Sequence, residues 1–409
     1  MHPVLKHFMA FLLACCLFVF CIAGHSQSPS MQKPLVLLIG LDGFKPAYLN
    51  LGVTPNLKAL AEKGLLSQGA ISSFPSLTFP NFVSLVTGLT PDHHGIVNNT
   101  MTDSRTDQLF TLGSRDAVEN PFWWSGVTPI WSSIKRQGGI ASAMFWPGSE
   151  VEINGVRPND WVRYEHGMSH EKRLEFLVSW LSREEALRPN FATFYLSDVD
   201  SAGHEFGPDS QEVKRAVAKV DQTLGQLIKE VKKLGLIDKT TFVVVSDHGM
   251  ANTPHDKSMD VSQLLNGFPK AKWEWQGATS ALRLNGEDGA KVLEVLSQQA
   301  HLDCYLKENF PKHFKFGTHP RIPDVVCLSN MGYTVTANPS RKGPLGQHGF
   351  DPNLLEMHGL FLASGFRIKA GEIGLLENLE VYPFLCELLG IVEEKNDSKH
   401  LLKALIDKH

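Results

Sequence analysis

The stretch LVLLIGLDG at residues 35–43 decides the fold class, because it is a short apolar run that ends in an acidic residue and a glycine. Such a run is typical of a strand buried on both faces, as in a parallel sheet. Two later runs end in the same way: residues 191–197 lead into Asp198-Val199-Asp200, and residues 241–246 lead into Asp247-His248-Gly249. In an open α/β sheet ligands bind beyond the carboxyl ends of the strands, so we expect the three ends to form one site.

The rest of the chain alternates apolar runs with stretches of helical period, which predicts an α/β fold with a mostly parallel sheet flanked by helices. The strands are expected at residues 35–41, 140–145, 191–196, 241–245 and 359–363. The helices are expected at residues 55–63, 78–87, 128–136, 170–187, 209–233 and 376–389.

One region interrupts this alternation, from residue 267 to residue 341, where amphipathic strands, a helix and proline-rich loops follow one another. We interpret it as a small inserted region, called the cap region below, within one catalytic domain at residues 29–409. Internal repeats and low-complexity linkers are absent from the sequence.

The composition is that of a globular protein, with 409 residues of which 43% are hydrophobic and 20% are charged. Lys and Arg number 39 and Asp and Glu number 43, a formal charge of -4, so no basic face for a nucleic-acid duplex is expected. Small phosphorylated substrates remain compatible with this charge if a metal ion supplies the positive charge. The sequence leaves the oligomeric state open.

Residues 1–28 have the pattern of a secretory signal peptide, with Lys6, an apolar run at residues 8–23 and a polar end. The run is shorter than the roughly 20 residues of a spanning helix, so we expect a periplasmic or extracellular protein without a membrane span in the mature chain. A permanent membrane anchor and a lipoprotein cleaved before Cys15 are the alternatives. After cleavage three cysteines remain, of which Cys304 and Cys327 are the pair that an oxidising compartment would join, and Cys386 is expected as a buried free thiol.

Asp42, Asp200 and Asp247 follow the three strands and would repel one another unless a cation lay among them. Taken singly, each has another reading as a turn or helix-capping residue. Their shared position at strand ends favours the metal reading.

Three histidines accompany these carboxylates. His204 follows Asp200 by four residues across a small, flexible linker, His248 is adjacent to Asp247, and His348 is flanked by residues that include Gly349. Oxygen and nitrogen donors suit Zn²⁺ or a similar divalent ion. The pair His93-His94 is interpreted instead as part of an exposed loop.

Thr78 is the candidate nucleophile. It lies at the start of a predicted helix with Pro80 in its first turn, where free backbone N–H groups favour negative charge. The alternative is that Thr78 only caps the helix.

Eight motifs in order then resemble one family, the nucleotide pyrophosphatases/phosphodiesterases of the alkaline phosphatase superfamily. They are IGLDG (39–43), SLTFPN (76–81), LVTGL (85–89), HGIVNN (94–99), FWPGS (145–149), DSAGH (200–204), SDHGM (246–250) and QHG (347–349). The resemblance runs from about residue 35 to residue 391 and implies an alkaline-phosphatase-like fold. Gln347 departs from the family's usual asparagine.

The resemblance implies two Zn²⁺ ions per chain. It assigns Asp42, Asp247, His248 and the reacting Thr78 to one ion, and Asp200, His204 and His348 to the other. It also implies that Asn99 donates a hydrogen bond to a phosphoryl oxygen, and that Phe79 and Tyr164 sandwich a nucleobase.

The implied activity is hydrolysis of nucleotide pyrophosphate or phosphodiester bonds through a phospho-threonine intermediate, with release of a nucleoside 5'-monophosphate. A lipid or choline phosphodiesterase on the same fold is the first alternative, suggested by the apolar cap region and by Trp123-Trp124. A catalytically inactive binding homologue is the second.

Overall fold

The computed structural model describes residues 34–338, 340 and 342–407. The predicted signal peptide and the alternatives to it fall outside the described residues. Among the helices of the described part, none is both long and apolar enough to cross a bilayer.

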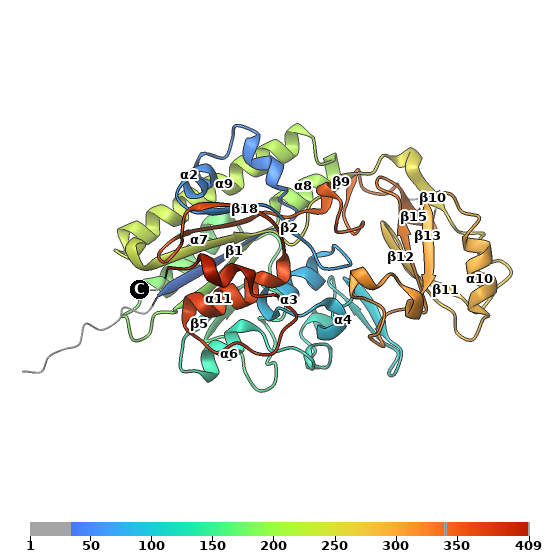
Figure 1. Cartoon of the computed structure of the whole chain (residues 1–409), viewed down its shortest axis with the longest axis horizontal. Coiled ribbons are helices and arrows are strands. Elements are labelled where there is room, and N and C mark those ends of the chain that lie inside the picture. Colours follow the sequence, from blue (N-terminus) through green and yellow to red (C-terminus); the bar gives the residue numbers. More distant parts are fainter. Residues whose placement is uncertain (1–33, 339, 341, 408–409) are drawn as a thin grey trace, which may run out of the picture. The chain divides into compact units, whose positions relative to one another are not determined.

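An eight-stranded sheet forms the centre of the structure, in the order β18-β2-β17-β8-β1-β7-β5-β6 (Figure 1). Its strands are β1 (Leu35–Leu41), β2 (Leu65–Ile71), β5 (Ala141–Met144), β6 (Asp160–Val162), β7 (Phe191–Leu196), β8 (Thr240–Val245), β17 (Phe361–Gly365) and β18 (Gly371–Glu377). Every neighbouring pair is parallel except the two that β17 makes with β8 and β2. The mostly parallel α/β sheet is therefore confirmed.

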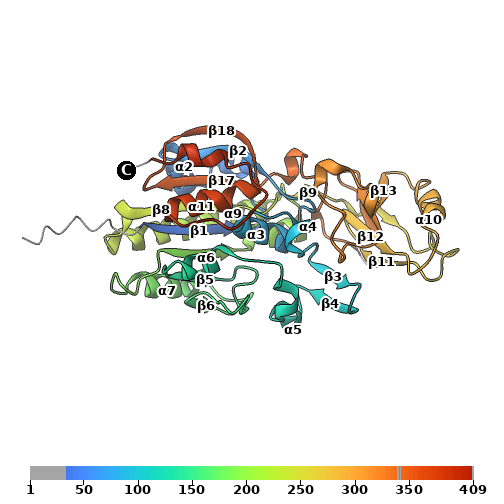
Figure 2. The same ribbon diagram turned by 60° about the horizontal axis from the view of Figure 1, so that its bottom comes forward.

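Helices cover both faces of this sheet (Figure 1). Helices α2, α7, α8 and α9 pack together on one side, and α3, α6 and α11 lie on the other. Their bounds are α2 (Pro55–Glu62), α3 (Thr78–Thr87), α6 (Ile130–Arg136), α7 (His170–Leu181), α8 (Asp198–Phe206), α9 (Gln211–Lys233) and α11 (Val381–Leu389). Two short helices, α4 (Pro91–His94) and α5 (Arg115–Val118), and the hairpin of β3 (Thr100–Asp103) with β4 (Gln108–Thr111) lie between this layer and the cap region (Figure 2).

The cap region contains a separate four-stranded antiparallel sheet in the order β11-β12-β14-β13, seen on the right of Figure 1. It comprises β11 (Lys272–Trp275), β12 (Thr279–Arg283), β13 (Leu302–Leu306) and β14 (Val325–Ser329), with α10 (Gly289–Leu296) packed on it. Cys304 and Cys327 lie opposite each other on β13 and β14 and form a disulfide. Cys386 is a buried free thiol, as expected. Two small ladders complete the strands: β10 (Ser258–Asp260) with β15 (Thr334–Thr336), and β9 (Ala251–Asn252) with β16 (Gly346–Gln347).

Several sequence expectations were wrong in detail. The predicted helix at residues 376–389 begins only at Val381, because residues 371–377 form strand β18. Strand β2 was missed, since its burial is interrupted by exposed Gln68. Residues 91–94 form a short helix in which His94 is buried, where an exposed loop was expected. His93 is exposed and pairs with Asp397.

Candidate metal centre and substrate cavity

The three strand ends meet as predicted, because β8, β1 and β7 are parallel neighbours in the sheet. Asp42 follows β1, Asp247 and His248 follow β8, and Asp200 lies in the first turn of α8 after β7. The small, flexible linker expected between Asp200 and His204 is instead helical, and it places the two side chains one turn apart.

Two glycines permit the close approach of these segments. Gly43 has a left-handed φ of 66°, and a Cβ there would lie 3.0 Å from the Cα of Asp200. Gly346, two residues before His348, lies so close to α8 that a Cβ would lie 2.3 Å from the Gly203 carbonyl oxygen. The backbone itself therefore brings the segments of Asp42, Asp200 and His348 together.

Each histidine ring is fixed in the same way, with Nδ1 facing a backbone carbonyl oxygen. His204 bonds to Gly346 at 2.8 Å, His348 to Ser76 at 2.8 Å and His248 to Gly249 at 2.9 Å. Because a carbonyl oxygen only accepts, Nδ1 carries the proton and Nε2 of the neutral ring is left as an electron-pair donor. This arrangement is common in metal-ligating histidines.

The Nε2 atoms and carboxylate oxygens then point at one another without hydrogens between them. Nε2 of His204 and Nε2 of His348 are 3.2 Å apart. One oxygen of each carboxylate, Asp42 Oδ1, Asp200 Oδ1 and Asp247 Oδ2, is buried without a hydrogen-bond partner. A proton on one histidine would satisfy only part of this cluster, whereas cations would satisfy all of it.

The distances fit two groups of ligands. Around His248, its Nε2 lies 3.0 Å from Asp247 Oδ2, 3.6 Å from Asp42 Oδ1 and 3.2 Å from Thr78 Oγ1. Two ligands bound tetrahedrally at about 2.1 Å from one ion lie about 3.4 Å apart. The residues of this first group therefore fit a metal ion.

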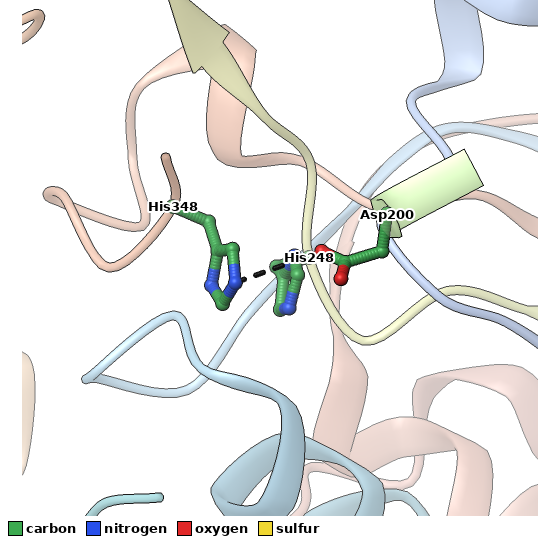
Figure 3. Close-up of side chains that lie close together, drawn as sticks. All are labelled: Asp200, His248 and His348. Carbon is green, nitrogen blue, oxygen red and sulfur yellow. Dashed lines mark ion pairs between the residues drawn. The ribbon is translucent and has the colours of Figure 1, made fainter. Parts of the chain in front are cut away.

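The second group lies around Asp200. Its Oδ1 is 3.3 Å from His204 Nε2 and 3.7 Å from His348 Nε2. The donor atoms of Asp200 and His348 also lie close to those of His248 (Figure 3). The rings of His248 and His348 stack, with their centres 3.5 Å apart. His248 thus lies between the two groups.

Burial and mutual charge shift the pKa values of the cluster. Burial, together with the nearby Asp247 and Asp200, raises the pKa of Asp42 well above its usual value, and burial raises the pKa of Asp200. Burial and the two neighbouring imidazoles hold the pKa of His348 well below its usual value. Burial alone would lower the pKa of His248, but the Asp247 carboxylate raises it. Such opposed shifts in one place are typical of functional sites.

Thr78 is the first residue of α3, and Leu77 holds the capping position without a side-chain cap bond. The alternative that Thr78 caps the helix is therefore not supported. The Thr78 hydroxyl instead donates to Nε2 of His248 at 3.2 Å. It lies at the N-terminus of α3, where the helix dipole favours negative charge.

A cavity of about 560 Å³ extends from this cluster. At the metal end Thr78, Asp42, Asp200, His204 and His348 line it. Asn99 lines it beside Thr78, and because Asn99 Oδ1 accepts the Phe79 N–H at 2.9 Å, its NH₂ group remains the donor available to a ligand.

Phe79 and Tyr164 line the same cavity and form what we call its aromatic end. Tyr164 is 37% exposed, and its backbone N–H donates to the Glu150 carboxylate at 2.7 Å. The structure thus places every predicted site residue in the cluster or along this cavity.

Sequence reasoning missed Tyr195 on β7, whose hydroxyl donates to Asp42 Oδ2 at 2.5 Å. It also missed Ser246, whose hydroxyl donates to the His248 carbonyl and accepts from the Phe44 N–H. A tyrosine inside a fully buried strand needs a hydroxyl partner, and that signal could have pointed to Tyr195. Asp198, which precedes Asp200 by two residues, pairs with His170 and Lys219 and does not line the cavity.

Comparisons with known proteins identify the family of the chain. Residues 36–351 match the family described as type I phosphodiesterase / nucleotide pyrophosphatase. The chain is 34% identical to ectonucleotide pyrophosphatase/phosphodiesterase family member 1 of Rattus norvegicus over 91% of its length, and spans 43% of that relative. It is 32% identical to the bis(5'-adenosyl)-triphosphatase enpp4 of Xenopus laevis, over 93% of this chain and 83% of that protein.

The chain therefore spans less than half the length of the first of these relatives. Among solved structures, an inactive threonine-to-alanine variant of murine ectonucleotide pyrophosphatase/phosphodiesterase 5 in complex with AMP superposes with a TM-score of 0.88. The two are 27% identical, and the match covers 92% of this chain and 100% of that one.

Proposed function

The chain belongs to the type I phosphodiesterase / nucleotide pyrophosphatase family, and we propose that it hydrolyses nucleotide pyrophosphate or phosphodiester bonds to release a nucleoside 5'-monophosphate. The observation that carries this proposal is the Thr78 hydroxyl, placed at a helix N-terminus, in contact with His248 and inside the substrate cavity. AMP bound to the murine relative supports a nucleotide product.

We propose that each chain binds two Zn²⁺ ions as its cofactor. Asp42, Asp247, His248 and Thr78 would hold one, and Asp200, His204 and His348 would hold the other. The mixed oxygen and nitrogen donors and their spacing suit zinc. When bound, the ions would lower the pKa of the Thr78 hydroxyl and neutralise charge on the phosphoryl group.

The chain's own residues would then act in two displacements. Thr78 Oγ1 attacks phosphorus in line, the bond from phosphorus to the leaving oxygen breaks, and the threonine proton is released. Water next attacks phosphorus, the bond to Oγ1 breaks, and Thr78 regains a proton. In both steps the Asn99 NH₂ group donates to a non-bridging oxygen, a contact that is strongest as charge develops.

The other end of the cavity would bind the nucleoside. Phe79 and Tyr164 offer aromatic faces on which a base can stack, and stacking of this kind tolerates different bases. The lipid alternative loses one of its reasons, because Trp123 and Trp124 are each only 1% exposed and offer no apolar surface to a lipid.

A pair of chromogenic substrates tests the activity and its specificity. We expect hydrolysis of p-nitrophenyl thymidine monophosphate to exceed that of p-nitrophenyl phosphorylcholine. The reverse order would favour the choline alternative. Failure on both substrates in metal-loaded protein would contradict the proposed activity and favour the inactive homologue.

We also propose that residues 1–28 are removed and that the mature protein acts in the periplasm or outside the cell. The Cys304–Cys327 disulfide supports an oxidising compartment. N-terminal sequencing of protein recovered from the periplasm or medium should begin near residue 29. Full-length protein retained in the cytosol would contradict export.

A further inference from the structure

Arg321, in the connection between β13 and β14 of the cap region, is an almost fully buried arginine, 3% exposed, that contacts residues outside the cap region. Its Nη1 donates to the carbonyl oxygens of Gly95 at 2.7 Å and Trp123 at 3.0 Å, and its Nε donates to Asp103 Oδ2 at 3.1 Å. Nη2 donates to the Phe122 carbonyl at 3.3 Å. The guanidinium also lies over the Trp123 ring, 4.7 Å from its centre. It is therefore held by charge, hydrogen bonds and stacking at once.

Two of these partners, Gly95 and Asp103, are the two ends of one short segment. Asn99 lies midway between them, immediately before β3. Arg321 thus binds both ends of the segment that carries Asn99.

A second contact from the cap region binds the same segment. Glu274 Oε1 accepts the Thr102 N–H at 2.8 Å, and Arg283 donates to the Thr102 carbonyl at 3.0 Å. Arg283 also pairs with Glu274 at 2.6 Å and donates to the Arg321 carbonyl at 2.7 Å. These charged residues of the cap region form one network, and its contacts outside the cap region lie on residues 95–103 and on the carbonyl oxygens of Phe122 and Trp123.

The position of this backbone matters because Asn99 has few constraints of its own. Its Oδ1 accepts the Phe79 N–H and its carbonyl accepts the Leu112 N–H, so the backbone on either side sets where its NH₂ group lies. Displacement of a reacting or stabilising group by about 1 Å costs about 100-fold in rate. Fixing residues 95–103 would therefore fix the distance from the Asn99 NH₂ group to the phosphoryl oxygen.

We propose that Arg321, assisted by Glu274 and Arg283, is a positioning residue that couples the cap region to catalysis through Asn99. The proposal rests on the proposed function, because it uses the role of Asn99 there. On this proposal the cap region contributes to transition-state stabilisation by holding Asn99 in position, rather than by covering the cavity.

A double-mutant cycle tests the coupling, with kcat/KM measured on p-nitrophenyl thymidine monophosphate. We expect Asn99→Ala to lower kcat/KM about 100-fold, as loss of one such donor does. Arg321→Lys should lower it about tenfold in the wild-type background and less than about twofold in the Asn99→Ala background, because residues that act together are non-additive. Glu274→Ala should lower kcat/KM by a smaller factor and show the same coupling to Asn99→Ala. It replaces Arg321→Lys in the cycle if that variant does not fold.

Arg367→Lys is the matched control. Arg367 is also a partly buried arginine bonded to backbone carbonyls, at Asp407, Glu387 and Leu388, none of which lines the cavity. It should lower kcat/KM less than about twofold. An equal factor for Arg321→Lys in both backgrounds would overturn the proposal, since it would show a general structural effect.

Hydrogen exchange separates this proposal from the proposed function, because it needs no activity. Peptides covering residues 76–82 and 95–103 should exchange faster in Arg321→Lys than in wild type or Arg367→Lys. Unchanged exchange in both peptides would overturn the positioning role, whatever the substrate. Faster exchange in a protein that hydrolyses no nucleotide would instead contradict the proposed function alone.

Discussion

The two ends of the substrate cavity are built differently. At the metal end most candidate ligands are fixed by a second bond: the three histidines through Nδ1 to backbone carbonyls, Asp42 through the Tyr195 hydroxyl, and Asp247 through the Gly43 N–H. At the aromatic end Tyr164 is 37% exposed, and its hydroxyl pairs with His166, on its own loop, at 3.1 Å. A rigid end suits chemistry, which tolerates little displacement, and a looser end suits the binding of different nucleosides.

Loss of the nucleophile should have the largest effect. We expect Thr78→Ala to lower kcat by about 10⁴-fold or more, as loss of a covalent nucleophile does in other enzymes. AMP binding, measured by calorimetry, should remain within a few-fold of wild type, because the aromatic end is untouched. Hydrolysis at the wild-type rate in this variant would refute the covalent mechanism.

Loss of a side chain that supports a candidate metal ligand should have an intermediate effect. Tyr195→Phe removes the hydroxyl that donates to Asp42, and loss of such a support weakens metal affinity by about 10- to 100-fold. Competition with a chromogenic chelator measures this affinity. Tyr382→Phe is the matched control, because Tyr382 is also buried but its hydroxyl accepts the Glu394 N–H instead. Equal affinities in the two variants would argue against a role for Tyr195.

Substitution at the aromatic end should have the smallest effect, and it should change KM rather than kcat. Loss of one stacking face costs about 1–3 kcal/mol, so Tyr164→Ala should raise KM roughly 5- to 150-fold for a nucleotide while kcat changes little. With bis-p-nitrophenyl phosphate, which has no nucleobase, KM should stay unchanged, and Tyr164→Phe should behave as wild type. A fall in kcat on both substrates would show that the two ends are not separate.

The difference between the two ends also explains what the sequence could predict. The residues of the metal end follow from local patterns, because strands β1, β7 and β8 are each followed closely by a carboxylate and parallel neighbours share an edge. The first and last residues of strands β1 and β7 and of helix α3 were predicted correctly, because the apolar pattern of each is uninterrupted.

Contacts between segments that are distant in the sequence could not be predicted from local patterns. Neither the bond from Tyr195 to Asp42 nor the contact of Arg321 with Gly95 and Asp103 leaves a trace in spacing, because each joins residues more than 100 positions apart. The helical conformation of residues 200–204 was missed because Ser201, Ala202 and Gly203 resemble a flexible linker, although α8 begins directly after β7.

The metal content of the purified protein tests the central claim most directly. Zinc measured by elemental mass spectrometry after reconstitution and removal of free ions should reach two per chain. Dialysis against a chelator should remove both ions together with the activity, and added Zn²⁺ should restore both. Full activity in verified metal-free protein, or a reconstituted content below one ion per chain, would contradict the account.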